Sequence, residues 1–166
     1  MQKQYYSFEQ GGWKFIMLDS MTRREGGFLA ALEPEEKEWL KGELQSAGTE
    51  KPIAIFSHIP LVAVCVFFTG KPAAEDGFHI AHHSMHVDVR ELLDLLAPYN
   101  VKLLVSGHIH VVDRIEYRDM TFICDGSISG NWWRGPRLQS PEGYGVFDFH
   151  ADGRFDHRYV AYGWKA

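Results

Sequence analysis

The chain has 166 residues, a length that suits one domain with its own hydrophobic core. Its formal net charge of −5 argues against a nucleic-acid surface or an anionic-membrane surface driven by bulk charge. No apolar run approaches the roughly 20 residues that span a bilayer, and the amino terminus has no secretory h-region. Cys65 and Cys124 are too few for a disulfide framework, and nothing in the chain indicates a compartment.

The first half of the chain alternates strand and helix patterns. Residues 5–20, YYSFEQGGWKFIMLDS, predict two short strands joined by a hairpin, and residues 21–32 are expected to be a loop. The segment PEEKEWLKGELQSAG predicts a helix from Pro34 to near Gly48, with acidic residues in the first turn. Residues 51–58, KPIAIFSH, then predict a buried strand that ends in a histidine.

The second half begins with a long predicted loop, residues 61–86, and a helix within residues 87–100. The strand VKLLVS follows, so the strand–helix–strand order predicts two neighbouring parallel strands. From Val111 onward the pattern alternates and predicts two antiparallel hairpins, with turns at Arg118-Asp119 and Asp152-Gly153. The fold class is therefore α/β, with a mixed sheet and antiparallel carboxyl-terminal strands.

Histidines are concentrated at the ends of the two predicted parallel strands. His58 ends the first, and the segment Gly107-His108-Ile109-His110 follows the second. Because ligand sites of open α/β sheets lie beyond the carboxyl ends of the strands, we expect these three imidazoles at one sheet edge. Imidazole nitrogens bind zinc, manganese and iron, so His58, His108 and His110 are candidate metal ligands. The alternative is that they are hydrogen-bonded structural histidines.

The segments PIAIFSHIPL and VKLLVSGHIH resemble the last two metal motifs of the calcineurin-like metallophosphoesterases. This resemblance implies that His58 and His108 hold one metal ion and that His110 holds the other. It also implies a portion of a four-layer α/β/β/α sandwich, two Zn, Mn or Fe ions in the full site, and hydrolysis of a phosphomonoester or phosphodiester. The helix segment EEKEWLKGEL and the segment CDGSISGNWWRGP resemble the corresponding family elements.

Of the first three family motifs, GDxxD and GNH do not occur in the chain, and a DxH triplet occurs only at Asp148-Phe149-His150, after the GHIH segment rather than before it. Residues 1–166 are therefore expected to be a single partial domain, the carboxyl-terminal half. The resemblance then places the catalytic histidine upstream of Met1, so we expect at most one weak metal site and no activity from this chain alone. Three neutral histidines supply no negative charge to offset the repulsion between two close cations.

Candidate substrate-binding residues lie in two loop segments and are chosen because their side chains can contact a phosphate or an organic group. His82 and His86 lie in the long loop, and Asn131, Trp132 and Arg134 lie in a glycine-flanked loop, where the arginine could pair with a phosphate. The alternatives are spare histidines in a solvated loop and tryptophans that cap the sandwich edge.

The last hairpin carries Asp148, Asp152, Asp156 and His157, which are expected to face solvent. The strand ending in His58 is expected to have an unpaired edge or an uncovered face. Such a strand predicts a homo-oligomer or a partner that covers it. A small phosphoester is the other expected partner, with no nucleic acid and no membrane. The competing function is a non-catalytic β-rich ligand-binding module with structural histidines.

Overall fold

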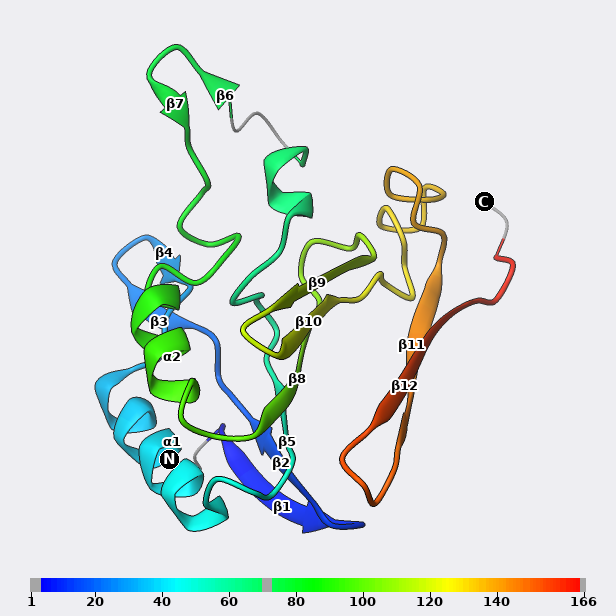
Figure 1. The fold of residues 1–166 in the computed structure, drawn as a ribbon. Helices are drawn as coiled ribbons and strands as arrows, with labels where there is room; N and C mark the ends of the chain where they lie inside the picture. Colours follow the sequence, from blue (N-terminus) through cyan, green and yellow to red (C-terminus); the bar gives the residue numbers. More distant parts are fainter. Residues whose placement is uncertain (1–3, 70–72, 165–166) are drawn as a thin grey trace.

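The computed structural model describes residues 4–69 and 73–164. Its centre is a six-stranded sheet with the order β1-β2-β5-β8-β10-β9 (Figure 1). The four central strands run parallel, and the two edge strands are antiparallel to their neighbours. The bounds are β1 Tyr6–Gln10, β2 Trp13–Met17, β5 Ile53–Phe56, β8 Val101–Ser106, β9 Asp113–Tyr117 and β10 Met120–Cys124. The mixed sheet confirms the predicted α/β class.

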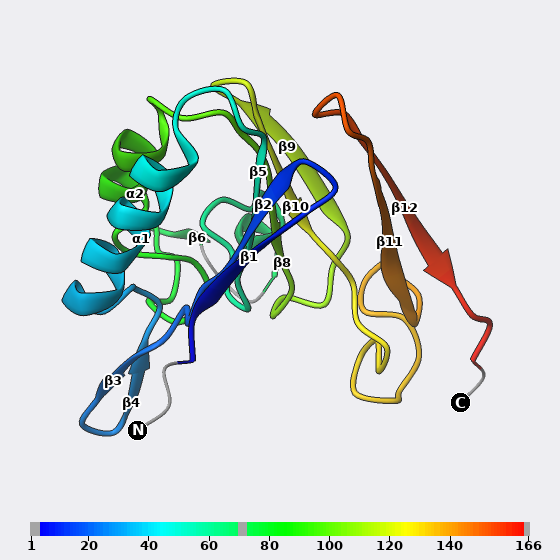
Figure 2. The same ribbon diagram turned by 90° about the horizontal axis from the view of Figure 1, so that it is seen from below.

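Two helices cover one face of the sheet, and Figure 2 shows both on the same side. These are α1, Pro34–Ala47, and α2, Val89–Leu96. Their apolar stripes pack on β5 and β8 through a core that includes Leu40, Leu92 and Leu104. The bounds of α1 confirm the predicted helix, because it starts at its proline and stops just before Gly48, where φ is +71°. No helix within the described ranges is long and apolar enough to cross a membrane.

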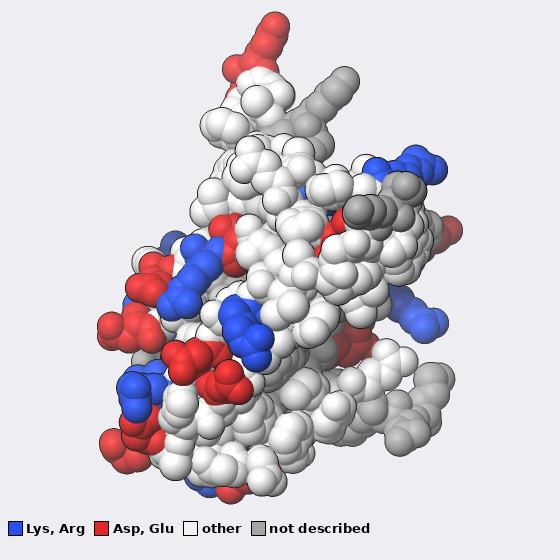
Figure 3. Space-filling view, turned by 90° about the vertical axis from the view of Figure 1, so that its right-hand side faces the viewer, with Lys and Arg blue, Asp and Glu red and all other residues white. Residues whose placement is uncertain are grey.

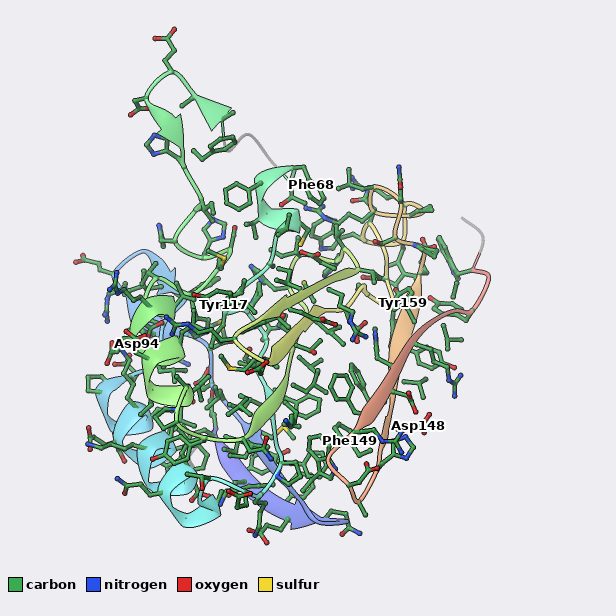
Figure 4. All side chains as sticks on the ribbon, viewed as in Figure 1. Phe68, Asp94, Tyr117, Asp148, Phe149 and Tyr159 are labelled. Carbon is green, nitrogen blue, oxygen red and sulfur yellow. The ribbon has the colours of Figure 1, made fainter. Side chains whose placement is uncertain are left out.

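A long antiparallel hairpin covers the opposite face of the sheet. It consists of β11, Gly143–Phe149, and β12, Phe155–Ala161. Phe149 packs edge-on against Trp13 of the sheet, with ring centroids 5.0 Å apart, whereas Asp148 lies on the other side of β11 (Figure 4). The indole Nε1 of Trp13 also donates a 2.7 Å hydrogen bond to the carbonyl of His150. On the molecular face beside this hairpin, acidic and basic side chains are interspersed (Figure 3).

Two stretches predicted as loops contain short elements. Residues 21–32 include a small hairpin, β3 Thr22–Arg24 and β4 Gly27–Leu29, so the prediction of a plain loop there is wrong. The predicted loop 61–86 contains a short 3₁₀ helix, Cys65–Phe67. It also contains the hairpin β6–β7, Ala73–Ala74 and Gly77–Phe78, which projects from the body in Figure 1. Residues 70–72 of this loop lie outside the described residues.

The strand that ends in His58 is β5, and it lies in the middle of the sheet. It pairs in parallel with β2 on one side and β8 on the other. Its side chains enter the helix-facing core through Ile53 and Ile55 and the hairpin-facing core through Ala54. The prediction of an unpaired edge or uncovered face is therefore wrong, because the β1–β2 hairpin supplies the missing neighbour. An exposed edge or face of β5 therefore gives no reason for self-association, which stays a prediction.

His157 of β12 faces the sheet, so the prediction that it faces solvent is wrong. Alternation along the strand turns Phe155, His157 and Tyr159 toward the sheet and Asp156 toward solvent. The His157 side chain is 9% exposed, and its Nε2 lies 3.0 Å from Oδ1 of Asp125, which follows β10. Burial raises the pKa of Asp125, and the nearby His157 opposes that shift. This pair ties the hairpin to the carboxyl edge of the sheet.

Replacing His157 with alanine should lower the free energy of unfolding by about 2–3 kcal/mol, because it leaves the Asp125 carboxylate buried without its partner. The matched control is His150→Ala in the same hairpin, whose pair with Asp156 is exposed and should be worth less than about 1 kcal/mol. Urea unfolding of both variants measures the difference. Equal losses in the two variants would contradict this account.

Glu36 in the first turn of α1 is buried, with 1% of its surface exposed. Its Oε1 accepts a 2.7 Å hydrogen bond from the backbone amide of Asp19, which follows β2. Burial raises the pKa of Glu36 from 4.5 to about 8, and the Asp19 hydrogen bond opposes the shift only in part. The folded protein therefore holds a proton on Glu36 that the unfolded chain releases above about pH 4.5.

The stabilisation from this bound proton is full below about pH 4.5 and is lost as the pH rises toward about 8. Glu36→Gln stays neutral and keeps an oxygen acceptor for Asp19. The variant should gain stability relative to the wild type between pH 5 and 8, by on the order of 4 kcal/mol. Urea unfolding across this pH range tests the prediction. The exposed Glu38→Gln is the control, and a pH-independent difference for Glu36→Gln would refute the assignment.

Candidate metal centre and the adjoining pocket

The carboxyl ends of β5 and β8 hold His58 and His108 side by side. The amide of Ser57 donates to the carbonyl of Val105, and the amide of Gly107 donates to the carbonyl of His58, each at 3.0 Å. These bonds extend the parallel ladder past both strand ends. Two of the three histidines that sequence analysis placed at one sheet edge, His58 and His108, are therefore close neighbours in the fold.

The two imidazoles approach through their nitrogens. Nδ1 of His108 lies 3.1 Å from Nε2 of His58, and the ring planes cross at 79°. Partial burial lowers the pKa of both rings, with further lowering of His58 by His110 and of His108 by His58. Both rings therefore favour the neutral form, which keeps a nitrogen lone pair for a ligand.

The Gly107–His110 segment turns both of its histidines away from the core. His108 and His110 have φ values of +66° and +62°, a left-handed conformation that non-glycine residues rarely adopt. Between them, Ile109 is 6% exposed and packs in a small core with Cys65 and Cys124. The buried Ile109 holds the turn in place, and this kind of local backbone strain is typical of functional sites.

His110 is oriented separately by the loop that follows β10. Its Nδ1 lies 2.7 Å from the carbonyl oxygen of Gly130, and its ring packs on Trp132 with centroids 4.9 Å apart. A carbonyl oxygen only accepts hydrogen bonds, so Nδ1 carries a hydrogen, and in the neutral ring the lone pair is on Nε2. Metal-binding histidines are commonly held in this way.

Within residues 4–69 and 73–164, no three His, Cys, Asp or Glu side chains are grouped so that they could hold a metal ion. The structure thus pairs His58 with His108, whereas His110 contacts the carbonyl of Gly130 and the ring of Trp132. The assignment of all three as metal ligands stays a prediction.

A pocket of about 410 Å³ adjoins His108. It lies between residues 66–69 and 79–84, the Gly107–His110 turn and the loop after β10, which contributes Trp132 and Arg137. Its polar lining is Thr69, His79, His83, Ser84, His108, Trp132 and Arg137, and its apolar lining is Val66, Ile80, Ala81 and Ile109. A smaller pocket of about 230 Å³ shares Arg137 and includes Asn131.

Only two of the five predicted substrate residues line these pockets. Trp132 and Asn131 line the two pockets, whereas Arg134 and His82 are exposed and line neither. His86 is buried, and its Nδ1 lies 3.0 Å from Asp88. The structure does not bring these last three to the pocket wall.

Sequence reasoning did not select three basic side chains of the pocket wall, His79, His83 and Arg137. His83 follows a predicted candidate by one residue, and Arg137 follows another by three. Both segments lack a regular period, so no pattern in the sequence indicated which side chain of each segment turns inward.

Comparisons with known proteins agree with the family resemblance. No family model matches the chain. It is 28% identical over 126 residues to the serine/threonine-protein phosphatase CPPED1 of Bos taurus, a match that covers 75% of this chain and 37% of that protein. The chain thus spans well under half the length of this curated relative.

Two solved structures share the fold. GAP50, the anchor in the inner membrane complex of Plasmodium, matches with a TM-score of 0.62 and 20% identity over 97% of this chain and 51% of that one. A dimetal phosphatase from Danio rerio matches with a TM-score of 0.51 and 15% identity over 74% and 49%. The sequence match and the shared fold together show that the chain is related to the calcineurin-like metallophosphoesterases.

Proposed function

We propose that this chain provides the histidine-bearing part of a metal-dependent phosphoester hydrolase site. His58 and His108 would hold one transition-metal cation, and a phosphomonoester or phosphodiester would bind in the pocket beside them. The observation that carries this proposal is the 3.1 Å separation of the two imidazole nitrogens at the carboxyl edge of the sheet.

The two nitrogens fit a shared cation. Metal–nitrogen bonds of about 2.0–2.1 Å place two ligands of a tetrahedral or octahedral ion roughly 2.9–3.4 Å apart. The observed 3.1 Å lies inside this range. Their lowered pKa values favour the neutral rings that a metal requires.

Zinc, manganese or iron would supply Lewis-acid polarisation of the phosphoryl oxygen and a more acidic water. His58 and His108 would hold the cation beside the pocket, and the hydrogen bond to the carbonyl of Gly130 fixes the orientation of the His110 ring. Two neutral imidazoles supply no negative charge, so we propose one weak site for this chain, with no turnover by the chain alone.

The relatives support the reaction class. The bovine relative is named a serine/threonine-protein phosphatase, and one structural relative is a dimetal phosphatase. Both names fit a site that acts on phosphate esters, and the second name also fits a site that binds metal ions.

Zinc titration of the chelator-treated chain by calorimetry should show one weak site. His58→Ala and His108→Ala should each weaken binding by about tenfold or more, because each removes one of two ligands. His150→Ala, at the far hairpin, should bind zinc as the wild type does. Two tight sites per monomer, or unchanged binding by His108→Ala, would overturn the proposal.

A further inference from the structure

The pocket beside His108 is lined by neutral and cationic groups. Among the described residues that form its wall there are imidazoles, hydroxyls and one guanidinium, but no carboxylate. His79 does meet a carboxylate, Asp76, at 2.8 Å, but Asp76 is not part of the wall. The wall is therefore suited electrostatically to an anion.

Arg137 is the permanent cation of this wall, and its position is fixed. Its guanidinium carbon lies 4.9 Å from the centroid of the Trp132 ring, and that ring packs in turn on His110. Reciprocal 3.0 Å backbone hydrogen bonds with Ser140 hold the main chain of Arg137. Trp132 thus lies in contact with both Arg137 and His110, a candidate metal histidine.

The guanidinium of Arg137 has an unused donor. Its Nε is buried and has no hydrogen-bond partner, and no carboxylate pairs with this side chain in the part of the chain that the structure describes. A buried donor without a partner is unfavourable by about 1–3 kcal/mol, so such a group calls for a ligand or another explanation. The contact with Trp132 is a cation–π contact, which gives the guanidinium no oxygen acceptor for its N–H groups.

We propose that Arg137 is a phosphate-binding residue, which holds the phosphate of the substrate by paired in-plane hydrogen bonds in the pocket beside His108. Arginine matches phosphate oxygens in this bidentate manner. The apolar wall, Val66, Ile80 and Ile109, would contact the organic part of the ester. The identity of the ligand as a substrate rests on the proposed function, whereas binding of the phosphate group itself needs no metal.

Arg134 offers the natural comparison within the same loop. It carries the same charge three residues earlier, yet it is exposed and lines neither pocket. General attraction of an anion to the loop would depend on both arginines equally. A built phosphate site depends on Arg137 alone.

The test is binding of inorganic phosphate to the full chain in the presence of chelator, followed by phosphorus NMR line broadening and by tryptophan fluorescence. Arg137→Gln should weaken binding by about tenfold or more, and Arg134→Gln by less than about twofold. Arg137→Lys keeps the charge but not the planar fork, so it should bind at least about threefold more weakly than the wild type. Circular dichroism establishes that each variant is folded.

Equal weakening by Arg137→Gln and Arg134→Gln would overturn the proposal, as would wild-type binding by Arg137→Gln or by Arg137→Lys. Because chelator is present throughout, these outcomes do not depend on metal binding. If the chain binds no zinc but binds phosphate through Arg137, the hydrolase proposal is refuted and the phosphate site is supported. If zinc binds as proposed but phosphate binding does not depend on Arg137, the Arg137 proposal is refuted and the metal proposal is unaffected.

Discussion

Parallel pairing of β5 with β8 is the constraint on which the candidate site depends. The register pairs Phe56 with Val105, so the two strands end together and the histidines that follow them meet. A slip of one residue would send the apolar side chains of β5 to the opposite faces and would separate the imidazoles. The side chains of β5 pack into a core on each face of the sheet. This packing fixes the register of β5 and, with it, the distance between His58 and His108.

Sequence analysis predicted the elements whose periodicity is strong and whose ends carry a clear signal. The helix that starts at Pro34, the strands before the two histidine motifs and the turns at Arg118-Asp119 and Asp152-Gly153 are all present. Each depends on local rules of capping, alternation or turn conformation. The candidate pair of His58 and His108 followed from these elements, because strand ends converge in a parallel sheet.

The errors concern residues whose surroundings come from distant parts of the chain. His157 was assigned to solvent together with the aspartates of the last hairpin, but the side-chain alternation of β12 and the carboxylate of Asp125 place it inside. The inward arginine of the loop after β10 could not be identified, because irregular backbone sets its direction. Trp132, with φ at +53°, shows how far that loop departs from any regular period.

The two edges of the main sheet differ as surfaces for strand addition. Edge strand β9 presents Arg114 and Glu116, an exposed ion pair of 3.0 Å, which disfavours an incoming apolar strand. Edge strand β1 instead exposes the aromatic rings of Tyr6 and Phe8, at 57% and 46%. The charged pair therefore opposes strand addition more strongly at β9 than at β1.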